Sequence, residues 1–335
     1  MRKTFNFNSL KRPWLRYVLA TVLLAVLIGV VPVAKIWNVL TTANPIPLCV
    51  AAVAILTARL LGAMRTKVLT DHQGLSFSLR SIFEISCAST LYSMFLPGSF
   101  SGGIIRWYRF SQPHYGRSEA FAVLTAERVI DYLVLALFGL LCLTVETAAA
   151  QVPVVFWGLA GVAGVCLLVS LTILLGFGAP VSRWLQRHTN QSRWLPQAVL
   201  KVIRRVVNAI LQYHNLGARK VLLLLSHSLL FHIVATAAVY LMAVSLELNL
   251  SFTSVGWLRA FTVLLAAVPL TPSGLGVREF SLIYLLLPFD VSAPQAVAFS
   301  FIQYAGMVFV ALLGAFMDAR RYLRVRPKQS KRTLQ

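Results

Sequence analysis

Runs of about twenty apolar residues recur along this chain, and a helix of that length spans the hydrocarbon core of a bilayer. Hydrophobic residues make up 58% of the 335 residues, and charged residues only 12%. The mean hydropathy is +0.75, which lies outside the range of soluble globular domains. The sequence therefore predicts an all-α polytopic membrane protein, with a single transmembrane domain over residues 1–335.

The apolar runs are of two kinds. Two of them stop at helix-breaking segments: Ile82–Leu96 is short, and Phe252–Leu270 is followed only by the very short run Phe280–Leu287. The others are long enough to cross the membrane completely. These about six full spans are Tyr17–Ala34, Ile46–Met64, Ala120–Val145, Val152–Phe177, Val221–Leu246 and Ala296–Phe316.

The formal net charge of +21 comes from Lys and Arg residues that fall between the apolar runs. No nucleic-acid-binding motif accompanies them, so we expect no nucleic acid partner and assign the charge to the positive-inside rule and to anionic lipid. Both termini are then predicted to be cytoplasmic. The cations that decide this topology lie in residues 1–16, at Arg65, Lys67 and Arg80, in the amphipathic connection 179–220 and in the tail 319–335.

This charge distribution restricts how the two short runs cross the membrane. A single crossing by residues 81–118 would place the basic connection 179–220 outside, whereas a re-entrant hairpin keeps every basic loop on one side. The same reasoning makes residues 254–288 a re-entrant hairpin from the outside. The chain then divides into two units of span, span, hairpin, span, over 17–146 and 152–318. We therefore predict two re-entrant helical hairpins arranged as an inverted repeat.

The tips of both predicted hairpins carry the pattern P-x3-S-G-x3-R. The first copy runs from Pro97 to Arg106, and the second runs from Pro269 to Arg278. Broken helices and buried arginines are costly in hydrocarbon and tend to be functional. The pattern therefore indicates two matching sites in the two units.

The first copy has the chemistry of an anion site. Its prolines and glycines end one helix and leave backbone N–H groups free where the next begins, while its hydroxyls and its guanidinium add further donors for a phosphate. The alternative is that the glycines only permit close packing and that Arg106 extends to the cytoplasmic interface. The predicted substrate-binding residues here are Pro97, Ser99, Ser101, Gly102, Gly103 and Arg106.

The second copy offers a similar set of donors. We predict that Arg106 and Arg278 share one headgroup site from opposite sides of the membrane. The alternative is that Arg278 and the adjacent Glu279 only compensate each other's charge. The predicted binding residues of this copy are Pro272, Ser273, Gly274, Gly276, Arg278 and Glu279.

Three ionisable residues, Glu127, Arg128 and Asp131, lie within little more than one turn of an apolar span. We expect all three to face the protein interior, with Arg128 paired to Asp131 at i,i+3. They could supply a counter-charge for Arg106 or Arg278, a proton-coupling carboxylate, or a purely structural ion network. His227 and His232 are spaced poorly for a metal site and are expected to pack. No metal site or cofactor is predicted.

The segments LPGSFSGGIIRWYRF, SEAFAVLTAERVIDYL and PLTPSGLGVREF resemble the lysylphosphatidylglycerol synthase transmembrane (flippase-like) family, and the resemblance covers nearly the whole chain. It implies a bacterial inner-membrane protein that moves or handles a lipid. In the multiple-peptide-resistance proteins this module flips aminoacylated phosphatidylglycerol, and relatives are associated with hopanoid and isoprenoid-linked glycan pathways. Because this chain carries no soluble aminoacyl-transferase domain, we do not expect it to synthesise lysylphosphatidylglycerol.

The leading hypothesis is a lipid flippase or transporter that is not an enzyme. It would bind the anionic headgroup of a phospholipid or isoprenoid-linked lipid near the midplane, between the two re-entrant loops. One alternative is a membrane-embedded transferase acting on a lipid-linked substrate, although the cytoplasmic loops carry no Asp-x-Asp or His-x4-Asp motif. Another is an accessory subunit that recruits a lipid-modifying enzyme. No oligomeric state is predicted.

Overall fold

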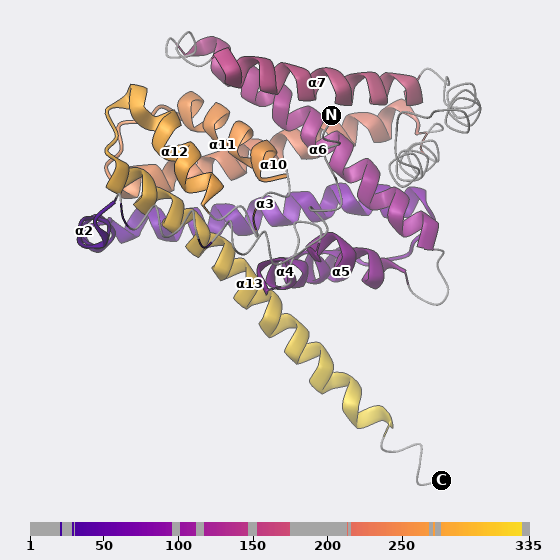
Figure 1. Cartoon of the computed structure of the whole chain (residues 1–335). Coiled ribbons are helices and arrows are strands. Elements are labelled where there is room, and N and C mark those ends of the chain that lie inside the picture. The colour runs from indigo at the N-terminus through magenta and orange to yellow at the C-terminus, as the bar shows by residue number, and fades with distance from the viewer. Residues whose placement is uncertain are drawn as a thin grey trace, which may run out of the picture.

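The computed structural model describes residues 21, 29, 31–95, 101–111, 117–146, 153–174, 213, 216–267, 271 and 276–329, and every element within them is helical. Figure 1 shows their arrangement. The elements are α2 Val33–Thr41, α3 Pro45–His72, α4 Leu79–Phe95, α5 Ser101–Phe110, α6 Arg117–Val145, α7 Pro153–Leu174, α10 Ala218–Ser245, α11 Phe252–Ala267, α12 Val277–Leu286, the 3-10 turn η4 Leu287–Phe289, and α13 Ala293–Gln329.

Four of the described helices are long and apolar enough to cross a membrane: α3, α6, α10 and residues Ala293–Arg320 of α13. Each contains all or nearly all of one of the predicted spans, so the chain is a multi-pass membrane protein. The 22-residue α7 lies within the predicted span 152–177. Most of the predicted span 17–34 and of the connection 179–220 lies outside the described residues.

Helices α3 and α10 form a long antiparallel pair. At one end the backbone N–H of Asn44 donates to the carbonyl of Ser245 at 2.8 Å. At the other end the Lys220 ammonium lies 3.4 Å from Nδ1 of His72. The Asn44 side chain also caps α3 by accepting from the N–H of Ile46 at 3.0 Å, which satisfies a donor that the helix start leaves free.

Helices α4 and α5 pack against each other and run in opposite directions. The Phe77 and Phe110 rings, which precede α4 and end α5, meet edge to face at 5.2 Å. Gly102 faces the backbone of Ser89, and a Cβ at this position would lie 3.0 Å from the Ser89 carbonyl oxygen. A Cβ here would be tighter than ordinary contacts, so glycine favours this close approach.

Helices α11 and α12 form a second short pair. The Trp257 ring in α11 lies 6.3 Å from the Phe289 ring, which follows α12. With 16 and 10 residues, both helices are shorter than the roughly 20 residues that a span requires. Gly276, which precedes α12, has φ +82°, a conformation that favours glycine.

The two short pairs are fixed to long helices through close glycine contacts. A Cβ at Gly314 in α13 would lie 2.4 Å from the backbone of Cys87 in α4. A Cβ at Gly139 in α6 would lie 2.4 Å from the side chain of Ala260 in α11. In a bilayer no hydrophobic effect drives helices together, so their association depends on close packing, which small residues allow. Packing of this kind positions α4 and α11.

Two acidic residues lie at one end of the bundle, and the basic end of α13 lies at the other. Glu146 ends α6 and bonds the start of α11, while Glu247 follows α10 at the end that Ser245 shares with the start of α3. At the other end, Arg109 of α5 donates to Asp318 of α13 with 2.7 Å between Nη1 and Oδ1. The basic remainder of α13 continues beyond this pair, away from the other helices (Figure 1).

Glu146 joins the end of α6 to the start of α11. Its Oε2 accepts O–H bonds from Ser251 at 2.9 Å, Thr253 at 3.2 Å and Ser254 at 2.7 Å. Partial burial acts to raise the pKa of Glu146, but these three hydrogen bonds outweigh it and hold the pKa below its ordinary value. The carboxylate also lies at the positive N-terminus of α11, which favours its charge.

We expect Glu146 to contribute to acid stability. Because its folded-state pKa is lowered, its contribution is present above the unfolded carboxyl pKa of about 4.3 and is lost as the pH falls through the lower, folded-state pKa. Thermal unfolding of the detergent-solubilised protein between neutral and acidic pH measures this loss. Glu146→Gln should flatten the acid slope, whereas Glu247→Gln, at an exposed position, should not. Equal slopes for wild type and Glu146→Gln would contradict the expectation.

Candidate functional site

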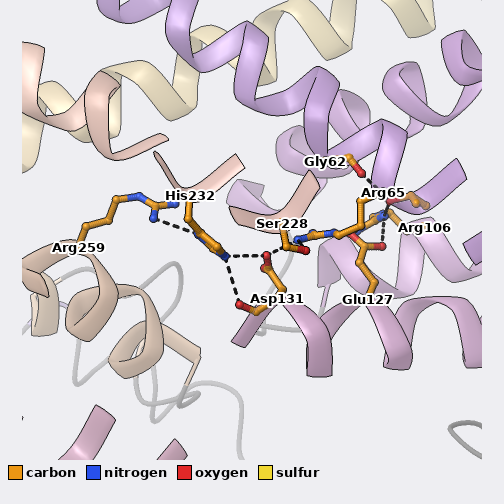
Figure 2. Close-up of polar contacts among 9 residues, drawn as sticks. Gly62, Arg65, Arg106, Glu127, Asp131, Ser228, His232 and Arg259 are labelled. Atoms are coloured by element: carbon orange, nitrogen blue, oxygen red, sulfur yellow. Dashed lines mark hydrogen bonds and ion pairs between the residues drawn. The ribbon is translucent and has the colours of Figure 1, made fainter. Parts of the chain in front are cut away.

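A row of charged side chains crosses the interior of the helix bundle where α3, α5, α6, α10 and α11 meet (Figure 2). Neighbouring members of the row are joined by hydrogen bonds or ion pairs, and each is buried or partly buried. We call this row the charged cluster. It consists of Arg106, Glu127, Arg65, Asp131, His232 and Arg259.

Arg106 of α5 forms a two-pronged pair with Glu127 of α6. Its Nη1 donates to Oε1 at 3.1 Å and its Nη2 to Oε2 at 2.6 Å, the fork geometry that makes Arg–carboxylate pairs strong. The Arg106 side chain is 11% exposed, so it does not extend to an interface. Of the roles that the sequence left open for this acidic group, a counter-charge for Arg106 agrees with this pair.

Arg65 connects the two carboxylates of α6. Its guanidinium donates to Asp131 Oδ1 at 2.5 Å, to Ser228 Oγ at 3.1 Å and to Glu127 Oε1 at 3.4 Å. The residue is only 3% exposed. Its assignment to a cytoplasmic connection was therefore wrong, because α3 continues to His72 instead of ending with its apolar run at Met64.

His232 of α10 extends the row to α11. Its Nε2 lies 3.2 Å from both Oδ1 and the backbone carbonyl of Asp131, and its Nδ1 lies 3.2 Å from Nη1 of Arg259. A guanidinium can only donate, so Nδ1 accepts and Nε2 carries the proton that is donated to Asp131. The ring is neutral in this arrangement. The expectation that His232 only packs is incomplete, because it is also a bonded member of the cluster.

Arg128 does not belong to the cluster. The residue is exposed, and its guanidinium lies 6.0 Å from the Tyr132 ring. The prediction that it faces the interior and pairs with Asp131 was wrong. Successive residues of a helix are rotated by about 100°, so the face that carries Glu127 and Asp131 turns Arg128 outward, and Arg65 takes its predicted place.

The second motif has its own set of contacts. Arg278 donates from Nε to Ser300 Oγ at 2.9 Å, and its Nη2 lies 3.4 Å from Glu279 Oε1. Glu279 is fully buried, accepting from Ser300 Oγ at 2.6 Å and from the Gly276 N–H at 2.7 Å. The charge compensation between Arg278 and Glu279 that the sequence left open as an alternative is therefore present.

The described residues include only part of the predicted loops. Gly102 and Gly103 lie in the first turn of α5, which begins at Ser101. Within the described residues, no group of three or more His, Cys, Asp or Glu side chains could hold a metal ion. The predicted site residues that lie outside the described part of the chain are Pro97, Ser99, Pro272, Ser273 and Gly274.

The cluster contains donors that have no partner among the described residues. The Nε atoms of Arg65 and Arg106 are both buried and make no hydrogen bond there. A buried N–H of a charged group that stays unbonded is costly, so such a donor favours an anionic oxygen or a water. Sequence reasoning missed Arg65, His232 and Arg259 as members of this site. The sequence feature that could have identified them is that each is a polar or charged residue within a mostly apolar helix.

Comparison with known proteins identifies the family. No curated protein matches the chain. The family model described as "Lysylphosphatidylglycerol synthase TM region" matches residues 14–314, a range that includes both P-x3-S-G-x3-R motifs and the whole charged cluster. This multi-pass membrane protein therefore belongs to the lysylphosphatidylglycerol synthase transmembrane-region family.

Proposed function

We propose that this protein is a flippase or transporter that moves an anionic lipid across the bacterial inner membrane, with the headgroup held beside Arg106. The observation that carries the proposal is the two-pronged pair of Arg106 with Glu127. A phosphate offers a guanidinium the same pair of oxygens as a carboxylate does. Glu127 can therefore occupy the anion position of Arg106 when no lipid is bound.

This exchange explains why a carboxylate and an arginine lie together inside an apolar bundle. Glu127 is 7% exposed, and a buried charge without a partner costs several kcal/mol. Arg65 contacts Glu127 as well as Asp131. When a lipid headgroup binds Arg106, Glu127 keeps its contact with Arg65. Glu127 therefore has a cationic partner both with and without bound lipid.

We further propose that α4–α5 and α11–α12 are re-entrant hairpins of an inverted repeat. The packing supports this: α4 lies against α13 as α11 lies against α6, and α3 of the first unit packs against its counterpart α10 of the second. The arginines also correspond. Arg106 bonds Glu127, 21 positions later, and Arg278 bonds Ser300, 22 positions later. In this proposal the headgroup passes between the two hairpin arginines near the midplane.

The proposed orientation places both termini in the cytoplasm. Its support is the separation of charge, with Glu146 and Glu247 at one end of the bundle and Lys220 and the basic end of α13 at the other. Short loops rich in Lys and Arg remain on the cytoplasmic side of bacterial membranes.

Translocation of fluorescent phosphatidylglycerol in proteoliposomes, followed by dithionite quenching, tests the proposal. Arg106→Gln and Arg278→Gln should each slow translocation by about 10–150-fold, since a hydrogen bond to a charged group is worth about 1.5–3 kcal/mol. The control is Arg80→Gln, because Arg80 is a 72% exposed cation at the start of α4 that pairs only with Glu84 among the described residues.

Two outcomes would contradict the proposal. Wild-type rates in both hairpin variants, with circular dichroism showing that they are folded, would exclude a headgroup site at these arginines. Mass spectrometry of the recovered lipid separates transport from chemistry. Unmodified lipid is expected, and a covalently altered product would instead indicate the membrane-embedded transferase.

A further inference from the structure

The charged cluster and its surroundings hold more positive than negative charge. Four buried or partly buried guanidiniums gather there, those of Arg65, Arg106 and Arg259 within the cluster and that of Arg59 beside it, while the exposed Arg128 is left out of this count. Only two carboxylates face them, those of Glu127 and Asp131. His232 is neutral and adds no charge. Within the described residues two positive charges are therefore in excess. Uncompensated charge inside a membrane bundle is costly, and such residues pair with one another or with a ligand.

The two carboxylates are already committed. Glu127 accepts both prongs of Arg106, and Asp131 accepts from Arg65 and His232. Arg59 and Arg259 form no ion pair or hydrogen bond with a carboxylate in the part of the chain that the structure describes. The excess charge therefore belongs to these two residues.

Among the described residues, the side chains in hydrogen-bond or ring contact with Arg259 of α11 are neutral. Its Nη1 lies 3.2 Å from Nδ1 of His232, and its guanidinium carbon lies 5.9 Å from the centre of the Phe231 ring. The same ring also faces Arg65 at 5.4 Å. Ring faces and imidazole lone pairs attract a cation but carry no net negative charge. These contacts orient Arg259 without neutralising it.

Arg59 lies six residues before Arg65 on α3. It is partly buried and within electrostatic range of Arg106, Asp131 and Arg259. Arg59 and Arg259 therefore repel each other across the space between α3 and α11. An anion between them would turn this repulsion into two attractions, which gain strength where water is excluded.

We propose that Arg59 and Arg259 form an anion subsite beside Arg106 that selects a doubly charged phosphate, such as a phosphomonoester or diphosphate lipid, over a singly charged phosphodiester. A dianion matches the excess of two charges, whereas a phosphodiester leaves one cation uncompensated. The inference rests on the proposed function and specifies its substrate class. Phosphatidylglycerol is then a substrate that the protein moves, but not the one it prefers.

Lipid competition measures this selectivity. The wild-type protein in phosphatidylcholine nanodiscs at pH 8, above the second phosphate pKa of about 6, is offered phosphatidic acid and phosphatidylglycerol, and bound lipid is counted by native mass spectrometry. Phosphatidic acid should bind about tenfold or more tightly, the ratio for one additional ion pair of about 1.4 kcal/mol. Equal affinities in the wild type would overturn the inference.

Variants locate the subsite. Arg59→Gln combined with Arg259→Gln should bring the ratio close to one while phosphatidylglycerol still binds, and Arg80→Gln should keep the wild-type ratio. Arg259→Lys retains the charge and should retain the preference even if the double variant fails to fold. Preference for phosphatidic acid that persists in a folded double variant would overturn the assignment to these arginines.

Two further results separate the possible outcomes. Competition by millimolar inorganic phosphate would support a dianion site that also takes the free ion, and lack of competition would support one that requires the lipid. If Arg106→Gln abolishes phosphatidylglycerol binding but the wild type shows no dianion preference, the proposed function stands and this inference fails. If the wild type binds no anionic lipid, both fail.

Discussion

Replacing Arg65 with methionine should lower the free energy of unfolding by about 3–5 kcal/mol, the cost of breaking a buried ion pair by removing one partner. Methionine keeps an unbranched apolar side chain but leaves Asp131 with only the neutral His232 and takes one of the two cations from Glu127. SDS titration in mixed micelles measures the unfolding free energy. Translocation should fall as well, because Glu127 would then bind Arg106 permanently.

A matched substitution separates this effect from the general cost of removing an arginine. Arg80→Met breaks the pair with Glu84, but Arg80 is largely exposed, and such pairs contribute about 0–1 kcal/mol. Adding Asp131→Asn to Arg65→Met should recover part of the loss, because one uncompensated charge disappears. If Arg65→Met destabilises the protein no more than Arg80→Met does, the cluster is not the buried network described here.

Replacing Gly314 with valine should cost about 3 kcal/mol or more, at the upper end of overpacking effects. A Cβ there would lie 2.4 Å from both the carbonyl carbon and the carbonyl oxygen of Cys87. Those are backbone atoms of α4, so no side chain can move aside and the two helices must separate. Because α4 packs against α5, which carries Arg106, translocation should fall together with stability.

The control is a glycine in a helix without such a contact. Gly161 of α7 is exposed and has nothing within 4 Å of a Cβ position. Gly161→Val should therefore leave the unfolding free energy nearly unchanged. Similar losses in Gly161→Val and Gly314→Val would show that the cost comes from helix propensity or expression and not from the contact between α13 and α4.

The parts of the fold that depend on local pattern were predictable from the sequence. The four helices α3, α6, α10 and α13 follow from apolar runs, because length and hydropathy alone decide whether a helix can span. The shared face of Glu127 and Asp131 follows from their spacing of four residues. A counter-charge for Arg106 or Arg278 was one of three roles that the sequence left open for these acids, because only a few acids lie in apolar segments.

The rest of the site depends on contacts between distant segments. Arg65 pairs with Asp131 across 66 positions, and His232 reaches the same residue across 101. No local pattern relates such positions. Arg65 resembled a loop cation because it stands beside Lys67 at the end of an apolar run. Arg128 resembled an interior residue because spacing alone does not show which face of α6 is turned inward.

The glycine contacts have a consequence for motion. Gly314 joins α13 of the second half of the chain to α4 of the first, and Gly139 joins α6 of the first half to α11 of the second. The packed blocks are therefore not the two halves of the sequence, because α4 packs with α13 and α6 packs with α11 across the midpoint of the chain. Helices α3 and α10, which carry Arg65 and His232, contact both blocks. In the proposed transport cycle, a movement of one block against the other would therefore also rearrange the charged cluster.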